Sequence, residues 1–132
     1  MKISTLQQKF NKHIRDRDKD LGCISCGIKV SNPHAGHYLP VRWYGYLRFN
    51  KHNVNAQCQK CNIKNNFVGY RNGLILKIGI KALLNLEQQA LDGKPKNFTW
   101  SDKRKQKVLH DIKKIKSNNQ VNIENKHLKV GE

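Results

Sequence analysis

The amino-acid sequence predicts a mainly helical α+β protein whose small core needs an internal staple. Only 37% of its 132 residues are hydrophobic, which is a low share for a chain that must build its own core. The four cysteines form two C-x-x-C pairs, Cys23 with Cys26 and Cys58 with Cys61. Apolar residues recur at helical spacing before the first pair and after the second, whereas residues 27–57 carry short extended runs broken by glycine and proline.

Residues 4–20 predict the first helix. A single apolar stripe recurs every four residues at Leu6, Phe10 and Ile14. Ser4 and Gln7 match the S-x-x-Q capping box, so we expect Ser4 to cap this helix and Gly22 to follow its end.

Between the cysteine pairs the sequence favours loops and short strands. Gly27 follows the first pair, where a tight metal-binding turn needs a residue of unrestricted backbone. Residues 37–39 and 46–49 are the candidate arms of an irregular hairpin.

After Cys61 the pattern becomes helical. Residues 62–78 carry apolar residues at spacings of three and four, although Gly69 and Gly73 weaken this helix and could split it. Residues 80–91 predict a further helix, which 92–95 (DGKP) should end.

Residues 99–102 offer the cap of a last, strongly basic helix. Its predicted inner stripe is Val108, Leu109, Ile112 and Ile115. Residues 118–132 are polar and are expected to be disordered. We therefore divide the chain into an N-terminal helix, a metal-stapled core, two C-terminal helices for DNA binding or dimerisation, and a tail, over residues 1–22, 23–79, 80–117 and 118–132.

The charge balance indicates a polyanionic partner. Lys and Arg number 26 against 9 Asp and Glu, a formal net charge of +17, and residues 21–86 contain no carboxylate side chain. Nucleic acid is the first expectation, and an anionic membrane surface is the rival. The sequence shows no amphipathic anchor, lipidation motif or long apolar run, so we expect no membrane partner and a cytoplasmic location.

In a reducing cytoplasm, two C-x-x-C units indicate a metal site rather than disulfides. Each unit supplies two thiolates from one turn, and two units complete the tetrahedron of a structural Zn²⁺. A redox pair is the alternative. Because four thiolates fill the coordination sphere, we expect this zinc to hold the fold together rather than to act on a substrate.

The chemistry-bearing residues resemble a known nuclease motif. His37, Asn53 and Asn62, the last directly after Cys61, occupy the three positions of an HNH-type ββα-metal motif on a zinc knuckle. Over about residues 10–117 the chain is similar to the phage NinG, or Rap, recombination proteins. The blocks that carry this resemblance are FNKHIRDRDKD (10–20), CISCG (23–27), AGHY (35–38), LRFN (47–50), Asn53, QC (57–58), CN (61–62), YR (70–71) and IG (78–79).

The resemblance implies a zinc-knuckle ββα-metal core of treble-clef type with flanking helices, in a phage or prophage protein that acts in the host cell. It implies a structure-specific endonuclease that cuts branched DNA such as Holliday junctions and D-loops. His37 would be the general base, Asn53 would hold His37 and its hairpin in register, and Asn62 would be one ligand of a catalytic Mg²⁺ or Mn²⁺.

One departure from the family concerns the second metal. Family members commonly carry Asp three residues before the motif histidine, where this chain has His34. His34 could serve as a ligand and would favour a softer ion than Mg²⁺. On a regular strand His34 and His37 face opposite sides, so binding of one metal ion by both would need a turn or bulge at residues 35–36. Alternatively a distant carboxylate folds back: Asp16, Asp18, Asp20 or Glu87.

The expected DNA contacts are spread over the chain. They are Arg42, Arg48, Lys60, Lys64, Arg71, Lys103, Arg104 and Lys107. Trp43, Tyr44 and Tyr46 are either a stacking platform for unpaired bases or cover for the core, and we expect the latter for at least one ring. A homodimer is expected, because a four-way junction needs two symmetric cuts. The alternatives are an HNH nuclease that cuts or nicks duplex DNA, and a non-catalytic zinc protein that binds DNA.

Overall fold

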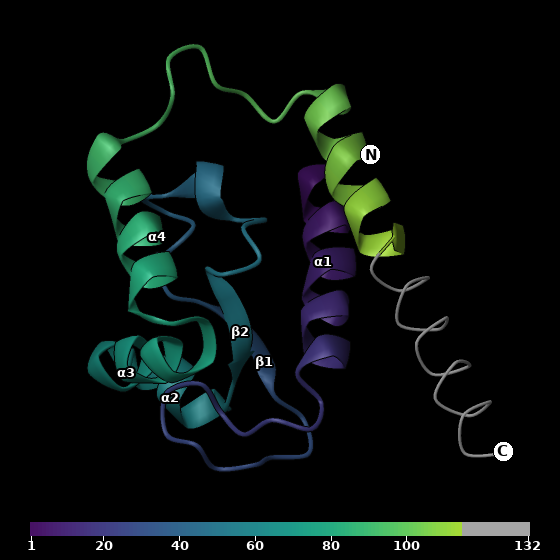
Figure 1. The fold of residues 1–132 in the computed structure, drawn as a ribbon. Helices are drawn as coiled ribbons and strands as arrows, with labels where there is room; N and C mark the ends of the chain where they lie inside the picture. The colour runs from purple at the N-terminus through teal and green to yellow at the C-terminus, as the bar shows by residue number, and fades with distance from the viewer. Residues whose placement is uncertain (115–132) are drawn as a thin grey trace, which may run out of the picture.

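A computed structural model of the protein describes residues 1–114, and it confirms a mainly helical α+β architecture around one small sheet (Figure 1). The elements in chain order are α1 (Ile3–Arg17), β1 (His34–His37), the 3₁₀ turn η1 (Gly45–Leu47), β2 (Val54–Gln57), α2 (Gln59–Lys64), α3 (Phe67–Ile78), α4 (Ile80–Asp92) and an unlabelled helix over 102–114. In Figure 1, α1 and the last helix lie on one side of the sheet, and α3 and α4 lie on the other.

The sheet is one antiparallel pair, in which His34 lies opposite Gln57 and His37 opposite Val54. The predicted hairpin arms at 37–39 and 46–49 are therefore wrong. All four residues of β2 are buried, because helices cover both faces of the sheet, so the strand has no alternation of polar and apolar residues. Residues 45–47 form η1 instead of a strand.

One part of the core joins α1 to the sheet. Leu6, Phe10 and Ile14 are buried as predicted, and they pack with Phe49 and Val54. The last helix covers the same cluster through Val108, Leu109 and Ile112, with Trp100 beside them. The predicted inner stripe is thus confirmed, except that Ile115 lies outside the described residues.

The other part of the core lies between η1, α3 and α4. Its fully buried members are Tyr38, Leu39, Leu47, Tyr70, Leu74, Leu83 and Leu86. The Tyr70 hydroxyl donates to the backbone oxygen of Gly36 at 2.6 Å, so α3 is hydrogen-bonded to β1 from inside the core. These contacts position the sheet relative to the helices that carry the candidate site.

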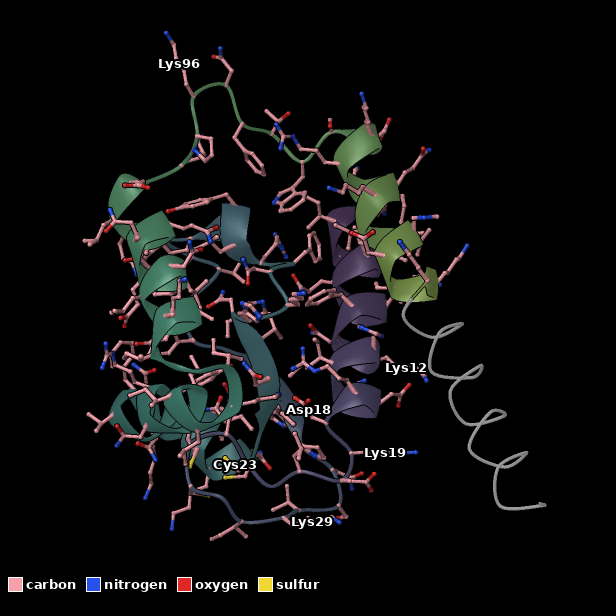
Figure 2. All side chains as sticks on the ribbon, in the orientation of Figure 1. Lys12, Asp18, Lys19, Cys23, Lys29 and Lys96 are labelled. Carbon is pink, nitrogen blue, oxygen red and sulfur yellow. The ribbon has the colours of Figure 1, made fainter. Side chains whose placement is uncertain are left out.

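The boundaries of α1 differ from the prediction at both ends. The helix begins at Ile3, with Lys2 as its N-cap and no side-chain capping bond, so the Ser4 capping box is wrong. The Gln7 side chain instead bonds Asn11 and Arg48. The helix ends at Arg17, and the C-cap residue Asp18 is 2% exposed (Figure 2).

The helix predicted over 62–78 is divided into α2 and α3, but not at a glycine. The break falls at Asn65, which adopts a left-handed conformation (φ 54°), and the Asn66 side chain then caps α3 by accepting from Gly69 N–H. Gly69 and Gly73 lie where the backbone of the first cysteine loop, residues 23–27, comes close to α3. A Cβ at either position would collide with the carbonyl oxygen of Ser25 or of Ile24.

The C-terminal predictions hold as far as the structure describes them. α4 ends at Asp92, and Gly93 follows with φ 81°. The Ser101 hydroxyl accepts from Arg104 N–H at 3.3 Å, which is the expected cap of the last helix. The tail over 118–132 lies outside the described residues.

Candidate metal centre and nuclease site

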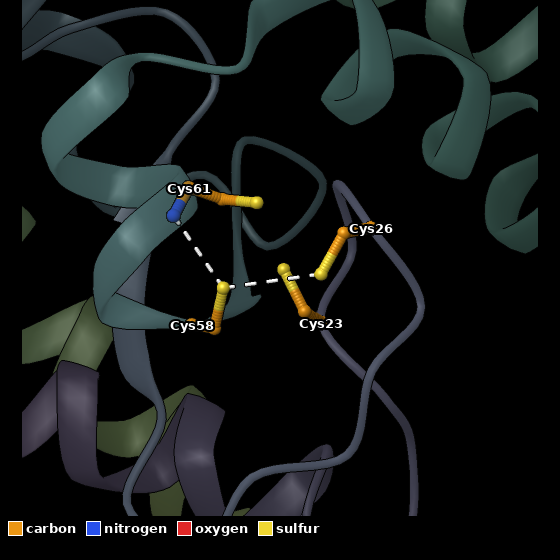
Figure 3. A group of neighbouring side chains, drawn as sticks. All are labelled: Cys23, Cys26, Cys58 and Cys61. Carbon is orange, nitrogen blue, oxygen red and sulfur yellow. Dashed lines mark hydrogen bonds between the residues drawn. The ribbon is translucent and has the colours of Figure 1, made fainter.

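The four cysteines converge at one end of the molecule. Their Sγ atoms all lie within 4.8 Å of one another, and Cys26 Sγ is 3.9 Å from Cys58 Sγ (Figure 3). A tetrahedral zinc with Zn–S bonds of about 2.3 Å separates its sulfur ligands by about 3.8 Å. Within residues 1–114, this is the one group of three or more His, Cys, Asp or Glu side chains placed to hold a metal ion.

Local structure aims the thiols at a common point. Gly27 adopts φ 79°, and its N–H donates to the Cys23 carbonyl at 2.8 Å, which closes the turn around the first pair. Cys58 directly follows β2 and is the N-cap of α2, where its sulfur accepts from Cys61 N–H at 3.4 Å. The first cysteine loop is also hydrogen-bonded to the sheet, because Ile24 N–H donates to the Ala56 carbonyl.

Of Cys23, Cys26 and Cys61, only Cys23 has surroundings that favour the thiolate. Burial opposes ionisation of Cys23, but hydrogen bonds from backbone amides and from the Cys26 side chain outweigh it and lower its pKa to about 7. Hydrogen bonds from the Ile28 backbone and the Asn66 amide favour the thiolates of Cys26 and Cys61, but burial and the neighbouring thiols outweigh them and raise the pKa of both. The Asn66 amide donates to Cys61 Sγ at 3.5 Å. Four sulfurs at tetrahedral spacing, with N–H donors directed at them, fit a structural zinc ion.

His34 and Asn62 are brought together from β1 and α2. His34 Nδ1 lies 3.1 Å from Asn62 Nδ2, and both side chains are exposed. Asn62 directly follows Cys61 on α2, so a metal ion bound by the cysteines would hold the helix that presents it. The contact brings an imidazole ring and an amide group together at the surface.

His37 is half-buried at the other end of β1. Its Nε2 lies 3.0 Å from the Arg48 carbonyl oxygen, so Nε2 donates and Nδ1 keeps the lone pair of the neutral ring. Burial lowers the pKa of His37 below its usual 6.5, and the positive Arg48 side chain lowers it further, although the hydrogen bond opposes both. His37 is therefore a neutral imidazole with one nitrogen available as a base at neutral pH.

The strand places His34 and His37 on opposite faces. The register from His34–Gln57 to His37–Val54 is continuous, so the bulge that joint use would need is absent from β1. Ala35, which shares its face with His37, packs against the α1 cluster, whereas His34 contacts α2. The structure thus pairs His34 with Asn62 and leaves His37 apart from them.

Asn53 is fully buried and ties together the segments on both sides of the loop. Its Oδ1 accepts from Leu39 N–H at 2.8 Å, and its Nδ2 donates to the Leu39 and Leu47 carbonyls at 3.1 Å each. These bonds join Leu39, two residues after His37, to Leu47, the residue before Arg48. Asn53 is thus connected to His37 through the backbone of this loop rather than by a hydrogen bond between the two side chains.

Three of the four carboxylates considered as metal ligands are engaged elsewhere. Asp18 accepts from Arg17, from Lys77 and from the Ala56 backbone N–H. Glu87 forms a two-bond pair with Arg71, at 2.9 Å for each bond, and accepts from the Tyr38 hydroxyl. Asp16 pairs with Lys12 on the surface. Asp20 is exposed.

The cations expected to contact DNA fall into two groups. Arg48 and Arg71 are half-buried: Arg48 donates to Gln7 and lies over the Phe49 ring, and Arg71 is neutralised by Glu87. The remaining six are exposed: Arg42, Lys60, Lys64, Lys103, Arg104 and Lys107.

No pattern in the sequence predicts the Asp18 network, because its partners come from three elements. Lys77 Nζ lies 2.9 Å from Asp18 Oδ1 and 2.6 Å from Asn55 Oδ1, and Arg17 bonds both residues as well. The Arg48 carbonyl was equally unpredictable, because any residue type could supply it. Neither feature leaves a pattern of residue types along the chain.

Comparisons with known proteins identify the family. The family model described as Bacteriophage Lambda NinG protein matches residues 2–124. Protein ninG of Escherichia phage lambda and that of Salmonella phage P22 are each 44% identical over 88 residues, 64% of this chain and 43% of the relative. Protein ninG of Escherichia phage 933W is 43% identical over 88 residues and 44% of its own length.

This chain thus matches less than half of each of these relatives. No solved structure matches it. Within residues 1–114, no helix combines the length and the apolar character needed to cross a membrane. The match of the family model over most of the sequence shows that the chain belongs to the NinG family of phage proteins.

Proposed function

We propose that this protein is a metal-dependent endonuclease that cuts branched DNA, such as Holliday junctions and D-loops, in phage recombination. The single observation that carries the proposal is the hydrogen bond that fixes His37 to the Arg48 carbonyl. It leaves Nδ1 of a neutral imidazole as the proton acceptor, which is what a general base for water requires.

The chemistry is hydrolysis of a phosphodiester. His37 Nδ1 takes a proton from water, the water oxygen attacks phosphorus, and the 3′-oxygen leaves. Asn53 acts as a positioning residue, because it holds the loop that carries both His37 and its hydrogen-bond partner. The membership of this chain in the NinG family supports a role in phage DNA metabolism.

His34 and Asn62 are the residues that would hold the catalytic cation. Such an ion would stabilise the charge that develops on the phosphate and on the leaving oxygen. His34 and His37 face opposite sides of β1, so the proposal assigns the cation and the base to different faces of the strand.

The charge distribution supports a DNA substrate. The net charge of +17 and the six exposed cations named above favour contacts with phosphate over a neutral ligand. A homodimer is part of the proposal, since two symmetric cuts across a junction need two active sites.

The test is cleavage of a labelled four-way junction and of a linear duplex of the same sequence. The parent and His37→Ala proteins are each assayed with Mg²⁺ and with Mn²⁺. We expect the parent to cut the junction preferentially, and His37→Ala to lose about 10²–10⁴-fold in rate.

Three other outcomes would each change the proposal. Equal cutting of junction and duplex would indicate a general HNH nuclease. Tight junction binding without cleavage in either metal would indicate a non-catalytic zinc protein that binds DNA. Undiminished cleavage by His37→Ala would remove His37 as the base.

A further inference from the structure

Trp43 is an unusually exposed aromatic residue. Its side chain is 69% exposed, although tryptophan is a residue that proteins usually bury to a large extent. It lies in the turn before η1, where its backbone N–H donates to the Pro40 carbonyl at 3.1 Å. The guanidinium of Arg42 lies 5.2 Å from its ring centroid, so a cation is stacked on an exposed aromatic face.

Trp43 lies on the rim of an open cleft at the C-terminal end of α4. The segment that joins α4 to the last helix arches away from the end of α4 (Figure 1), and its residues Gly93, Lys94 and 98–100 line one side of the cleft. The cleft encloses ≈ 680 Å³, within the range of roughly 300–1,000 Å³ found for small-molecule sites. It is lined by Tyr44, Tyr46, Phe98 and Trp100 besides Trp43.

The inner rings of the cleft are held by the fold. Trp100 Nε1 donates to the Gly45 carbonyl at 2.9 Å, and the Tyr46 hydroxyl donates to the Gln89 carbonyl at 3.0 Å. Phe98 packs edge-on against Trp100, with ring centroids 5.1 Å apart. Tyr44 packs against the core beside Tyr46. These rings form a fixed aromatic wall, whereas Trp43 leaves most of its surface open to a ligand.

Basic residues border the aromatic wall, and Asp92 lies close enough to Tyr46 to interact with it electrostatically. Lys94 lines the cleft beside Arg42, and Arg104 lies over the Phe98 ring at 4.5 Å from its centroid. Lys96 projects from the top of the arch (Figure 2). Aromatic faces to stack on, with cations around them, are the combination that binds an unpaired base and its phosphates.

We propose that this cleft binds an unstacked nucleobase of DNA, which stacks on Trp43 while Arg42 and Lys94 contact the flanking phosphates. The site rests on the proposed function only in taking DNA as the ligand. Neither His34 nor Asn62 lines the cleft, and the C-terminal end of α4, which borders it, lies at the opposite end of the molecule from α2 (Figure 1). An unpaired-base site would give the protein a preference for branched over fully paired DNA.

The test measures DNA binding without added Mg²⁺ or Mn²⁺, so that cleavage plays no part. The probes are a fluorescent 20-nucleotide oligothymidylate and a 20-base-pair duplex, at one fixed salt concentration. The proteins are the parent, Trp43→Ala, Trp43→Phe and, as the control, Leu76→Ala, which removes a side chain that is 89% exposed on α3.

We expect Trp43→Ala to weaken oligothymidylate binding about 5- to 150-fold, because stacking contributes that much per base. Duplex binding should change less than about twofold, Trp43→Phe should restore part of the loss, and Leu76→Ala should match the parent. The chain has two tryptophans, so the fluorescence difference between parent and Trp43→Phe isolates the Trp43 signal, which the oligonucleotide should quench.

Unchanged oligothymidylate binding by Trp43→Ala would overturn the inference, and so would an equal loss for the duplex. Neither result depends on catalysis. A parent protein that fails to cut any branched DNA would remove the proposed nuclease activity and leave this binding test intact.

Discussion

Asn62 of α2 and His34 of β1 are 28 residues apart in the chain, yet His34 Nδ1 lies 3.1 Å from Asn62 Nδ2. The contact exists because Cys58 and Cys61 hold the start of α2 against the end of the sheet. If the pair binds the catalytic cation, its histidine should set which ion supports cleavage.

We expect His34→Asp to raise cleavage with Mg²⁺ relative to Mn²⁺, because a carboxylate is a harder ligand than imidazole. The ratio of the two rates on a junction is the measurement. His110→Asp makes the same change at an exposed position of the last helix and should leave the ratio as it is in the parent. An unaltered ratio in His34→Asp would place the cation elsewhere.

The pH dependence of cleavage should report His37. Burial lowers the pKa of His37 below 6.5, so the base stays deprotonated to lower pH than an exposed histidine would. The rate should be constant near neutral pH and fall as pH drops through this lowered pKa. An acid limb centred at or above 6.5, or an identical limb in the residual activity of His37→Ala, would contradict the assignment.

The zinc should be required for folding. Cys61→Ser removes one of four converging sulfurs, and structural zinc contributes on the order of 10 kcal/mol, comparable to the whole stability of a small domain. We expect the variant to lose bound zinc and the cooperative thermal transition. Ser25→Ala, in the same loop, should keep one zinc per chain. A Cys61→Ser protein with full zinc content and an unchanged Tm would refute the site.

Asn53→Ala should destabilise the protein by roughly 2–4 kcal/mol, because it removes three hydrogen bonds at a fully buried position. Urea denaturation measures this loss. The matched control is Asn62→Ala, whose exposed side chain should contribute less than about 0.5 kcal/mol to stability. Equal midpoints for the two variants would mean that the loop is held in another way.

Asp18→Asn should cost about 3–5 kcal/mol, because it leaves the charges of Arg17 and Lys77 without their buried partner. Asp16→Asn, in an exposed pair with Lys12, should cost less than about 1 kcal/mol. Both losses are measured by denaturation at neutral pH.

The Asp18 contribution also has a defined pH dependence. Burial alone would raise the pKa of Asp18, but hydrogen bonds from Arg17, Lys77 and Ala56 outweigh it, so the folded-state pKa lies below 3.8. The unfolded chain therefore binds the proton first as pH falls. The stabilisation is complete well above pH 3.8 and is lost as pH falls through the folded-state pKa, and Asp18→Asn should abolish this acid-side loss.

The sequence alone predicted the features that depend on local spacing. Two C-x-x-C units predicted the cysteine cluster, because each places two sulfurs on one turn. The stripe of Leu6 and Phe10 predicted the buried face of α1, because helical period decides which side chains share a face. The two-residue period of a β-strand predicted that His34 and His37 would lie on opposite faces.

Only the tertiary structure decided the features whose partners lie far apart in the chain. Contacts between elements decide that β1 pairs with β2 rather than with residues 46–49. Such contacts also decide that Asp18 is buried and that Glu87 neutralises Arg71. The tertiary structure also decided that Tyr46 would be held by α4 while Trp43 stayed exposed, although both aromatic residues lie in one short segment. Residue type and spacing could not separate them, because burial depends on which helix packs against each ring.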